Sequence, residues 1–420
     1  MCRRKFTIEN DCCNENYADL NKCAVAGNIA IGCGKSQLNE FLAALNLPTF
    51  TEPVYKRNHD LISKHWEKVA LDQMEKAGEK ERAFALAEGK VNKDGIPIID
   101  VVADGCWIKR SYKKNYSALS GAAAIIGKKT GEILFLGIKN KYCYECVKAD
   151  KEKRQVKDHV CFKNYEGPST GMESQILVEG FMRSVEQHNL IYGRLISDGD
   201  SSTYAKILEA RPYVDVTVEK IECRNHLLRN FCSKLQALAT DTKYPIKYRK
   251  NLTKINILSA RRVIIKSIQK NKEDSNIQVL FSDILVSHLH AFGNHTKCKS
   301  YFCSQTGAAD NTNNEFFLSS LWQRVCFIVQ NLAAHSRSLY CDVDSNAVEQ
   351  FHSIVAKFVG GKRVNFSKRN SYQTRCYAAA ASYNDKRCIS RLYKSINKTN
   401  SPSGKLKSLE AQRIKKKNSK

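Results

Sequence analysis

The spacing of apolar positions changes several times along the chain. In residues 1–92 the runs "SQLNEFLAALNL" and "DLISKHWEKVALDQMEKAGEKERAFALAEGK" place apolar residues every three or four positions, which is typical of helices. After the break "KVNKDGIP", the run "IIDVVADGCWI" is rich in β-branched residues, and "SGAAAIIG" and "EILFLGIKN" flank the turn "GKKTG". The pattern predicts a helical N-terminal region over 1–92 and then three strands, the last two joined as a hairpin.

Helices and strands alternate in the next part of the chain. A helix predicted over "MESQILVEGFMRSVEQHN" precedes the strand "GRLIS", the helix "STYAKILEA" and a strand over "VDVTVEKIEC". Val214, Val216 and Val218 occupy alternate positions of that last strand, as in a half-buried strand. The order β-β-β-α-β-α-β predicts an α/β fold with a mixed sheet flanked by helices.

Helical spacing dominates the rest of the chain. We expect a core over 93–223 and 337–390, interrupted by a large, basic helical insertion over 224–336. The run "SNAVEQFHSIVAKFVGG" carries an apolar stripe at i, i+3, i+7 and i+10, so its helix is expected to pack on the sheet. Residues 391–420 are polar and basic, and we expect a disordered tail there.

The charge of the chain favours a polyanionic partner. Its 68 Lys and Arg residues exceed its 42 Asp and Glu residues, which gives a net charge of +26. Binding of such a surface to double-stranded DNA is favoured by the release of counterions from the phosphates. The run "CAVAGNIAIGCG" is too short to span a bilayer, so no membrane is expected as a partner. The 17 cysteines, an odd number, are expected to be buried thiols and metal ligands.

Three carboxylates stand where helices or strands of the predicted core could bring them together. Asp104 ends the first strand, Asp198 ends the fourth, and Glu349 lies on the late apolar-striped helix. Such carboxylates could hold two divalent metals about 3.5–4 Å apart, the arrangement that clamps a phosphodiester. Oxygen ligands suit Mg²⁺ or Mn²⁺.

Some of the acidic residues in these segments also have an ordinary explanation, although Asp198, which precedes the helix cap, does not. Asp200 is well placed to cap the helix that begins at Ser201, or to support the site from nearby. Glu349 follows Asn346 by three residues, which is the spacing of a capping box. Spacing alone leaves these alternatives open.

One group of cysteines and a histidine has the spacing of a zinc site. Cys143-x2-Cys146-x12-His159-x-Cys161 supplies four ligands within one long connection that has little apolar content of its own. Zinc would order this connection, whereas the alternative is four unrelated residues.

A second group, within the predicted insertion, has a knuckle-like spacing. It consists of His290-x4-His295-x2-Cys298-x4-Cys303, which would also suit zinc. His288 is an alternative ligand to one of the two histidines.

The runs "DGCWIKRSY", "LISDGDSSTY", "ECRNH" and "SNAVEQFHSIVAKFVGGKRVNF", in this order, resemble the Mutator-like transposases, in particular their animal branch in insects. The resemblance covers roughly residues 20–390. It implies an RNase H-like core whose DDE catalytic triad falls on Asp104, Asp198 and Glu349, with a helical insertion before the glutamate. A Cys-x-x-His element of this group falls on Cys223 and His226.

The resemblance implies a DNA transposase that cleaves DNA and transfers the freed end with a divalent metal. The chain would act on transposon ends and target DNA, associating with itself on DNA, in the nucleus, where "RIKKKNSK" would serve as an import signal. Lys362 and Arg363, after the helix of Glu349, are the best candidates for phosphate contacts. The alternatives are a domesticated, catalytically silent DNA-binding protein and an RNase H-like nuclease without strand transfer.

Overall fold

The chain folds into two compact units. The first comprises Met1–Gly193, Ser202–Val218 and Asn346–Lys420, and the second comprises Arg194–Ser201 and Glu219–Ser345. This computed structural model describes residues 20–107, 118–198, 201–273, 276–308, 314–361, 364–397, 402 and 404–418.

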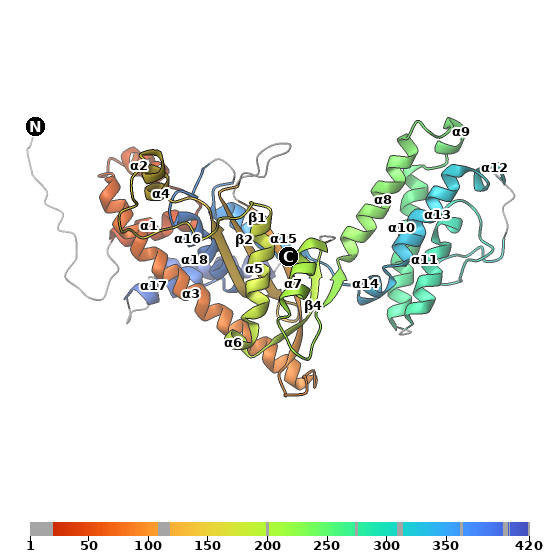
Figure 1. Cartoon of the computed structure of the whole chain (residues 1–420), viewed down its shortest axis with the longest axis horizontal. Coiled ribbons are helices and arrows are strands. Elements are labelled where there is room, and N and C mark those ends of the chain that lie inside the picture. Colours follow the sequence, from red (N-terminus) through yellow and green to blue (C-terminus); the bar gives the residue numbers. More distant parts are fainter. Residues whose placement is uncertain are drawn as a thin grey trace, which may run out of the picture. The chain divides into compact units, whose positions relative to one another are not determined.

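A five-stranded sheet of order β3-β2-β1-β4-β5 organises the fold (Figure 1). β2 pairs antiparallel with both β1 and β3, whereas β4 and β5 run parallel. The sheet is therefore mixed, which confirms the predicted α/β class and the predicted hairpin. The strands are β1 Ile98–Trp107, β2 Ser120–Gly127, β3 Ile133–Asn140, β4 Ile191–Ser197 and β5 Glu219–Glu222.

The last strand is much shorter than its sequence pattern indicates. We expected a strand through Val214, Val216 and Val218, but β5 begins only at Glu219, and Val214 is fully exposed. The reason is pairing: the register of β4 with β5 starts at Arg194↔Glu219. Alternating valines before that point do not make a strand, because a strand also needs a hydrogen-bonded neighbour.

Helices cover both faces of the first three strands. On one face, α5 (Gly171–Met182) lies so close that a Cβ at Gly137 would stand 2.2 Å from Cγ2 of Ile176. Neighbouring residues of a strand point to opposite faces. Gly105 faces Glu173 of α5, and Asp104 faces α15 (Asn346–Phe358), so α15 covers the other face.

The apolar stripe of α15 is buried as predicted. Val348, Phe351, Val355 and Phe358 are at most 4% exposed. α15 packs on β1, β2 and α16 (Ser371–Asn384), and α16 packs along the long helix α3 (Glu52–Ala87), whose Trp66 is fully buried (Figure 1). The remaining helices of this unit are α1 Leu20–Ala30, α2 Lys35–Ala44, α4 Tyr144–Lys151, α6 Ser184–His188, α7 Ser201–Ala210, α17 Cys388–Asn397 and α18 Gly404–Asn418.

Two helices lie wholly or partly within the segment that was expected to be a disordered tail, since α17 ends at Asn397 and α18 spans Gly404–Asn418. A buried contact joins α17 to α18. Glu410 of α18 is only 2% exposed, and it accepts hydrogen bonds from the backbone N (3.0 Å) and from Oγ of Ser390. A polar composition therefore did not prevent this segment from packing.

The second unit is mainly helical and has a core of its own. Buried apolar side chains from its longer helices, among them Phe231, Ile264, Leu280 and Val325, form one cluster. No helix within the described ranges is both long and apolar enough to cross a membrane. The helices of this unit are α8 Arg224–Thr240, α9 Ile246–Arg249, α10 Lys254–Glu273, α11 Ile277–Ala291, α12 Asn314–Phe317, α13 Ser320–Ala333 and α14 Ser336–Cys341.

Candidate functional site

Asp104 lies on the face of the sheet that α15 covers. Its Oδ1 accepts a 2.7 Å hydrogen bond from the backbone N of Gly105, and its Oδ2 stands 3.7 Å from Nδ1 of His352. The Asp104 side chain is 32% exposed and that of His352 is 19% exposed, so the carboxylate is sheltered but accessible. His352 was not singled out from the sequence, since a lone histidine on a helix has no distinctive spacing.

Glu349 belongs to the same helix as His352. It stands in the first turn of α15, three residues before His352, so the two side chains are neighbours on the helix surface. Glu349 is exposed, whereas the adjacent Val348 is fully buried. The burial of the apolar stripe fixes the rotation of α15 and brings His352 against Asp104.

The other two carboxylates of the predicted site follow β4. Asp198 comes directly after the last residue of β4, is half-buried and is counted in the second unit. Ser197 Oγ donates to the backbone carbonyl of Asp198 at 3.2 Å. Asp200 lies outside the described residues.

The structure brings Cys143, Cys146, His159 and Cys161 together. Their ligand atoms all lie within 4.8 Å of one another. Nε2 of His159 is 3.2 Å from Sγ of Cys143 and 3.5 Å from Sγ of Cys146, and Sγ of Cys146 is 3.6 Å from Sγ of Cys161. Tetrahedral zinc, with bonds of about 2.0–2.3 Å, would separate its ligands by about 3.5–3.8 Å.

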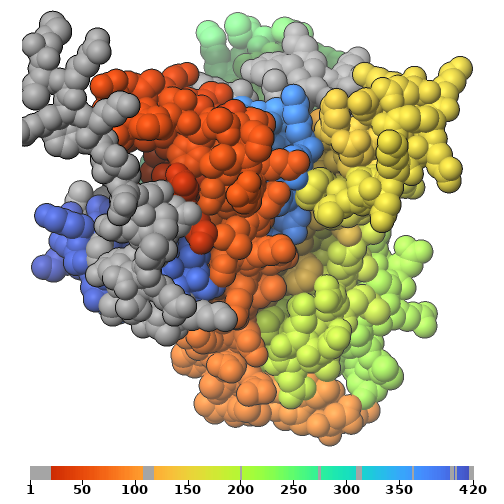
Figure 2. Space-filling view, turned by 90° about the vertical axis from the view of Figure 1, so that its left-hand side faces the viewer, coloured from red at the N-terminus to blue at the C-terminus, as the bar shows by residue number. Residues whose placement is uncertain are grey.

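The surroundings of this first group also suit a metal. Nδ1 of His159 is 2.8 Å from the backbone carbonyl of Lys157, which fixes the tautomer that leaves Nε2 as the ligand. Burial raises the pKa of the Cys143 thiol. Hydrogen bonds from the backbone N–H groups of Cys146 and Phe162 and from His159 lower the pKa by more than burial raises it, so that the net value is about 6. A thiolate is the form that binds zinc. The loop projects from the surface of the first unit as the yellow lobe in Figure 2.

The second group, His290, His295, Cys298 and Cys303, is also assembled. Nδ1 of His295 is 3.2 Å from Nδ1 of His290 and 3.4 Å from Sγ of Cys303, and Sγ of Cys298 is 3.4 Å from Nδ1 of His290. The four ligand atoms lie within 4.8 Å of one another. Both four-residue groups therefore have the chemistry and the spacing of a zinc site.

His288, the alternative ligand, is occupied elsewhere. Its Nε2 is 3.4 Å from Sγ of Cys326, and its ring packs against that of Trp322 at 4.9 Å. Burial lowers the pKa of His288 to about 4, so the ring stays neutral at physiological pH.

Cys223 and His226 join neither group. Across the described ranges, the groups with the geometry of a metal site are the two above. Cys223 is the N-cap residue of α8 and is buried, and its Sγ accepts a 3.4 Å hydrogen bond from Oγ of Ser345. Lys362 and Arg363 lie outside the described residues.

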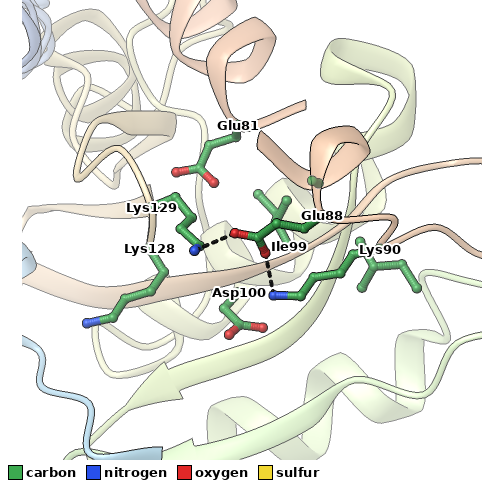
Figure 3. Close-up of a pocket in the computed structure, with 9 residues that line it drawn as sticks. Glu81, Glu88, Lys90, Ile99, Asp100, Lys128 and Lys129 are labelled. Atoms are coloured by element: carbon green, nitrogen blue, oxygen red, sulfur yellow. Dashed lines mark ion pairs between the residues drawn. The ribbon is translucent and has the colours of Figure 1, made fainter. Parts of the chain in front are cut away.

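A shallow pocket lies beside the first residues of β1, and the charged side chains that line it make contacts that stabilise the fold (Figure 3). In it, Glu88 makes ion pairs with Lys90 at 2.6 Å and with Lys129 at 2.5 Å. The buried Glu81 accepts hydrogen bonds from N and Oγ1 of Thr130, which ties α3 to the turn between β2 and β3. Asp100 lines this pocket and is therefore separated from the surroundings of Asp104.

A family model described as Mutator-like transposase matches residues 1–303. The match covers well over half of the chain, and the chain therefore belongs to the Mutator-like transposase family. Asp104, Asp198 and both cysteine–histidine groups lie within the matched span, and Glu349 lies beyond it. A comparison with curated proteins found no relative that matches the chain.

Proposed function

We propose that the protein is a DDE-type DNA transposase with an RNase H-like core, and that Asp104, Asp198 and Glu349 are its catalytic residues. The observation that carries the proposal is the contact of His352 with Asp104 at 3.7 Å, because it brings the helix of Glu349 onto the face of the sheet that bears Asp104. The position of Asp198 in the chain also supports the proposal, because Asp198 directly follows β4, and β4 is the neighbour of β1 in the sheet order.

In the proposed reaction, the oxygen of a water molecule attacks a phosphodiester phosphorus and forms a new P–O bond. The bond to the 3′ oxygen breaks, and this oxygen gains a proton. The freed 3′-hydroxyl then attacks a phosphodiester phosphorus of the target DNA and forms a new P–O bond as it loses its proton. The bond from that phosphorus to the 3′ oxygen of the target strand breaks, this oxygen takes up a proton, and the transposon end is thereby joined to the target strand.

The three carboxylates are suited to hold Mg²⁺ or Mn²⁺, since all their donor atoms are oxygens. Such ions lower the pKa of a bound water or hydroxyl and stabilise the charge on the phosphate. The chain's own contribution is to fix the donors: the Gly105 N–H and His352 hold the carboxylate of Asp104 from two sides. His352 is thus a positioning residue. Zinc at the two cysteine–histidine groups would have a structural role, and the site of action would be nuclear.

The first prediction tests the triad by separating DNA binding from cleavage. Asp198→Asn removes an anionic ligand of the metal. The rate of cleavage that depends on Mg²⁺ or Mn²⁺ should therefore fall by at least about 100-fold. DNA affinity should persist or rise, because the protein becomes less negative. The measurement is a cleavage assay beside a binding titration on the same transposon-end DNA, repeated for Asp104→Asn and Glu349→Gln.

Asp72→Asn is the matched control. Asp72 is an exposed residue of α3, and its substitution makes the same change in charge outside the proposed site. It should cleave like the wild type. Cleavage unaffected by Asp198→Asn would refute the triad. A wild-type protein that binds this DNA but never cleaves it, with any divalent metal, would favour a domesticated DNA-binding protein.

A further inference from the structure

The exposed side of α10, in the second unit, carries a row of positive charge. α10 has basic residues at six positions, and Glu273 is its single acidic residue. Arg262, Lys266 and Lys270 are four residues apart and exposed, so they follow one another along one side of the helix. Like charges at this spacing repel one another and destabilise an isolated helix. A polyanion lying along the row would remove that repulsion.

The neighbouring row of α10 holds the second cysteine–histidine group in place. Val263 packs with Phe302 and Cys303 of the loop that follows α11. One turn further on, Oγ of Ser267 accepts a 2.9 Å hydrogen bond from the hydroxyl of Tyr301. Each residue of this row follows a basic residue directly in sequence, so the loop and the charged row lie side by side on the helix.

A buried carboxylate anchors the same loop to α10 and α11. Asp283 is 1% exposed and accepts hydrogen bonds from Tyr301 at 2.6 Å and Asn271 at 2.9 Å, and Nζ of Lys299 stands 2.5 Å from it. A buried carboxylate with three partners holds its surroundings firmly. The loop is therefore a fixed part of the surface, and it carries a further exposed basic residue, Lys297.

We infer that this surface, defined by Arg262, Lys266, Lys270 and Lys297, binds the phosphate backbone of duplex DNA. The inference rests on the proposed function for the source of the DNA. Lys270 is eight positions beyond Arg262 on the helix, a distance along the axis of about 12 Å. Duplex DNA carries about seven phosphate charges over such a length. Lysines and an arginine on one rigid helix, with no acidic residue among them, suit contacts to phosphates rather than to particular bases.

The second prediction tests this surface by salt titration of the full-length chain on a fluorescent duplex of arbitrary sequence. The triple variant Arg262→Gln, Lys266→Gln and Lys270→Gln keeps good helix formers and should bind at least about tenfold more weakly. The slope of log affinity against log salt should fall by about 3, one for each lost phosphate contact. Circular dichroism and zinc content should match those of the wild type.

The matched control is Lys234→Gln, Lys243→Gln and Lys250→Gln, which removes the same charge from exposed positions of the same unit. It should keep most of the wild-type slope. A wild-type slope in the α10 variant, an equal loss in the control, or preference of the wild type for single-stranded RNA would overturn the inference. A cleavage assay distinguishes failure of the proposed function from failure of this inference. If the wild type binds DNA but does not cleave it, the salt slopes of the variants still test the surface.

Discussion

Individual cysteines can be tested for their role as zinc ligands. Sγ of Cys146 lies 3.5 Å from Nε2 of His159 and 3.6 Å from Sγ of Cys161, so a serine there would remove one of four ligands. The third prediction is that zinc-loaded wild type contains two zinc ions per chain and that Cys146→Ser contains one. Elemental analysis of freshly purified protein measures this.

Cys23→Ser is the control, because Cys23 is a cysteine of α1 that belongs to neither cysteine–histidine group. It should retain both zinc ions. A folded wild type without zinc would contradict the assignment, and so would a Cys146→Ser variant with full zinc content.

The sequence identified residues whose chemistry depends on spacing and missed those whose partners are distant. The Cys-x2-Cys and His-x-Cys spacings predicted the first group that the structure assembles, and the His-x4-His-x2-Cys-x4-Cys spacing predicted the second. His352 could not be recognised, because the strand that carries Asp104 lies far from it in sequence. The buried contact of Glu410 with Ser390 was likewise invisible in a segment of polar and basic composition.

Contacts between residues that are far apart in sequence position the helices and strands of the core. The clearest is at the C-terminal end of α15, where Arg375 of α16 is fully buried. Its Nη1 donates to the carbonyl of Phe358 and its Nη2 to that of Cys33, both at 2.6 Å, and its guanidinium lies 3.7 Å above the ring of Phe366. Burial lowers the pKa of Arg375 to about 10, which still leaves it charged at neutral pH. A cation there also stabilises the negative end of the helix dipole.

The fourth prediction is that Arg375→Leu lowers the free energy of unfolding by about 2–3 kcal/mol, because the buried carbonyl of Phe358 loses its donor. Chemical denaturation followed by circular dichroism measures this. Arg391→Leu is the control, since Arg391 pairs with Asp385 and its side chain is 49% exposed. Its cost should stay under about 1 kcal/mol. If the two variants lost the same free energy of unfolding, the buried hydrogen bonds of Arg375 would contribute no more to stability than an ordinary ion pair on the surface.

At the scale of the whole molecule, the division into two units separates the two cysteine–histidine groups. The group around Cys143 lies in the first unit, and the group around Cys298 lies in the second, which has its own apolar cluster. Apolar runs that are rich in β-branched residues or flank a turn predicted the first three strands of the sheet, and each of these strands has a pairing neighbour. The sequence pattern could not predict where β5 begins, since that depends on where β4 offers a partner.

The fifth prediction follows from this separation. Metal binding stabilises the cooperative unit that contains the ligands, and compact units with separate cores open independently. Cys146→Ser should therefore increase hydrogen exchange in α4 and the loop around it, and Cys298→Ser should increase exchange in α10 and α11. Exchange followed by mass spectrometry on both full-length variants and on the wild type distinguishes the two patterns. If either variant loosened both units to the same extent, the two groups would belong to one cooperative structure, and the chain would unfold as a single body.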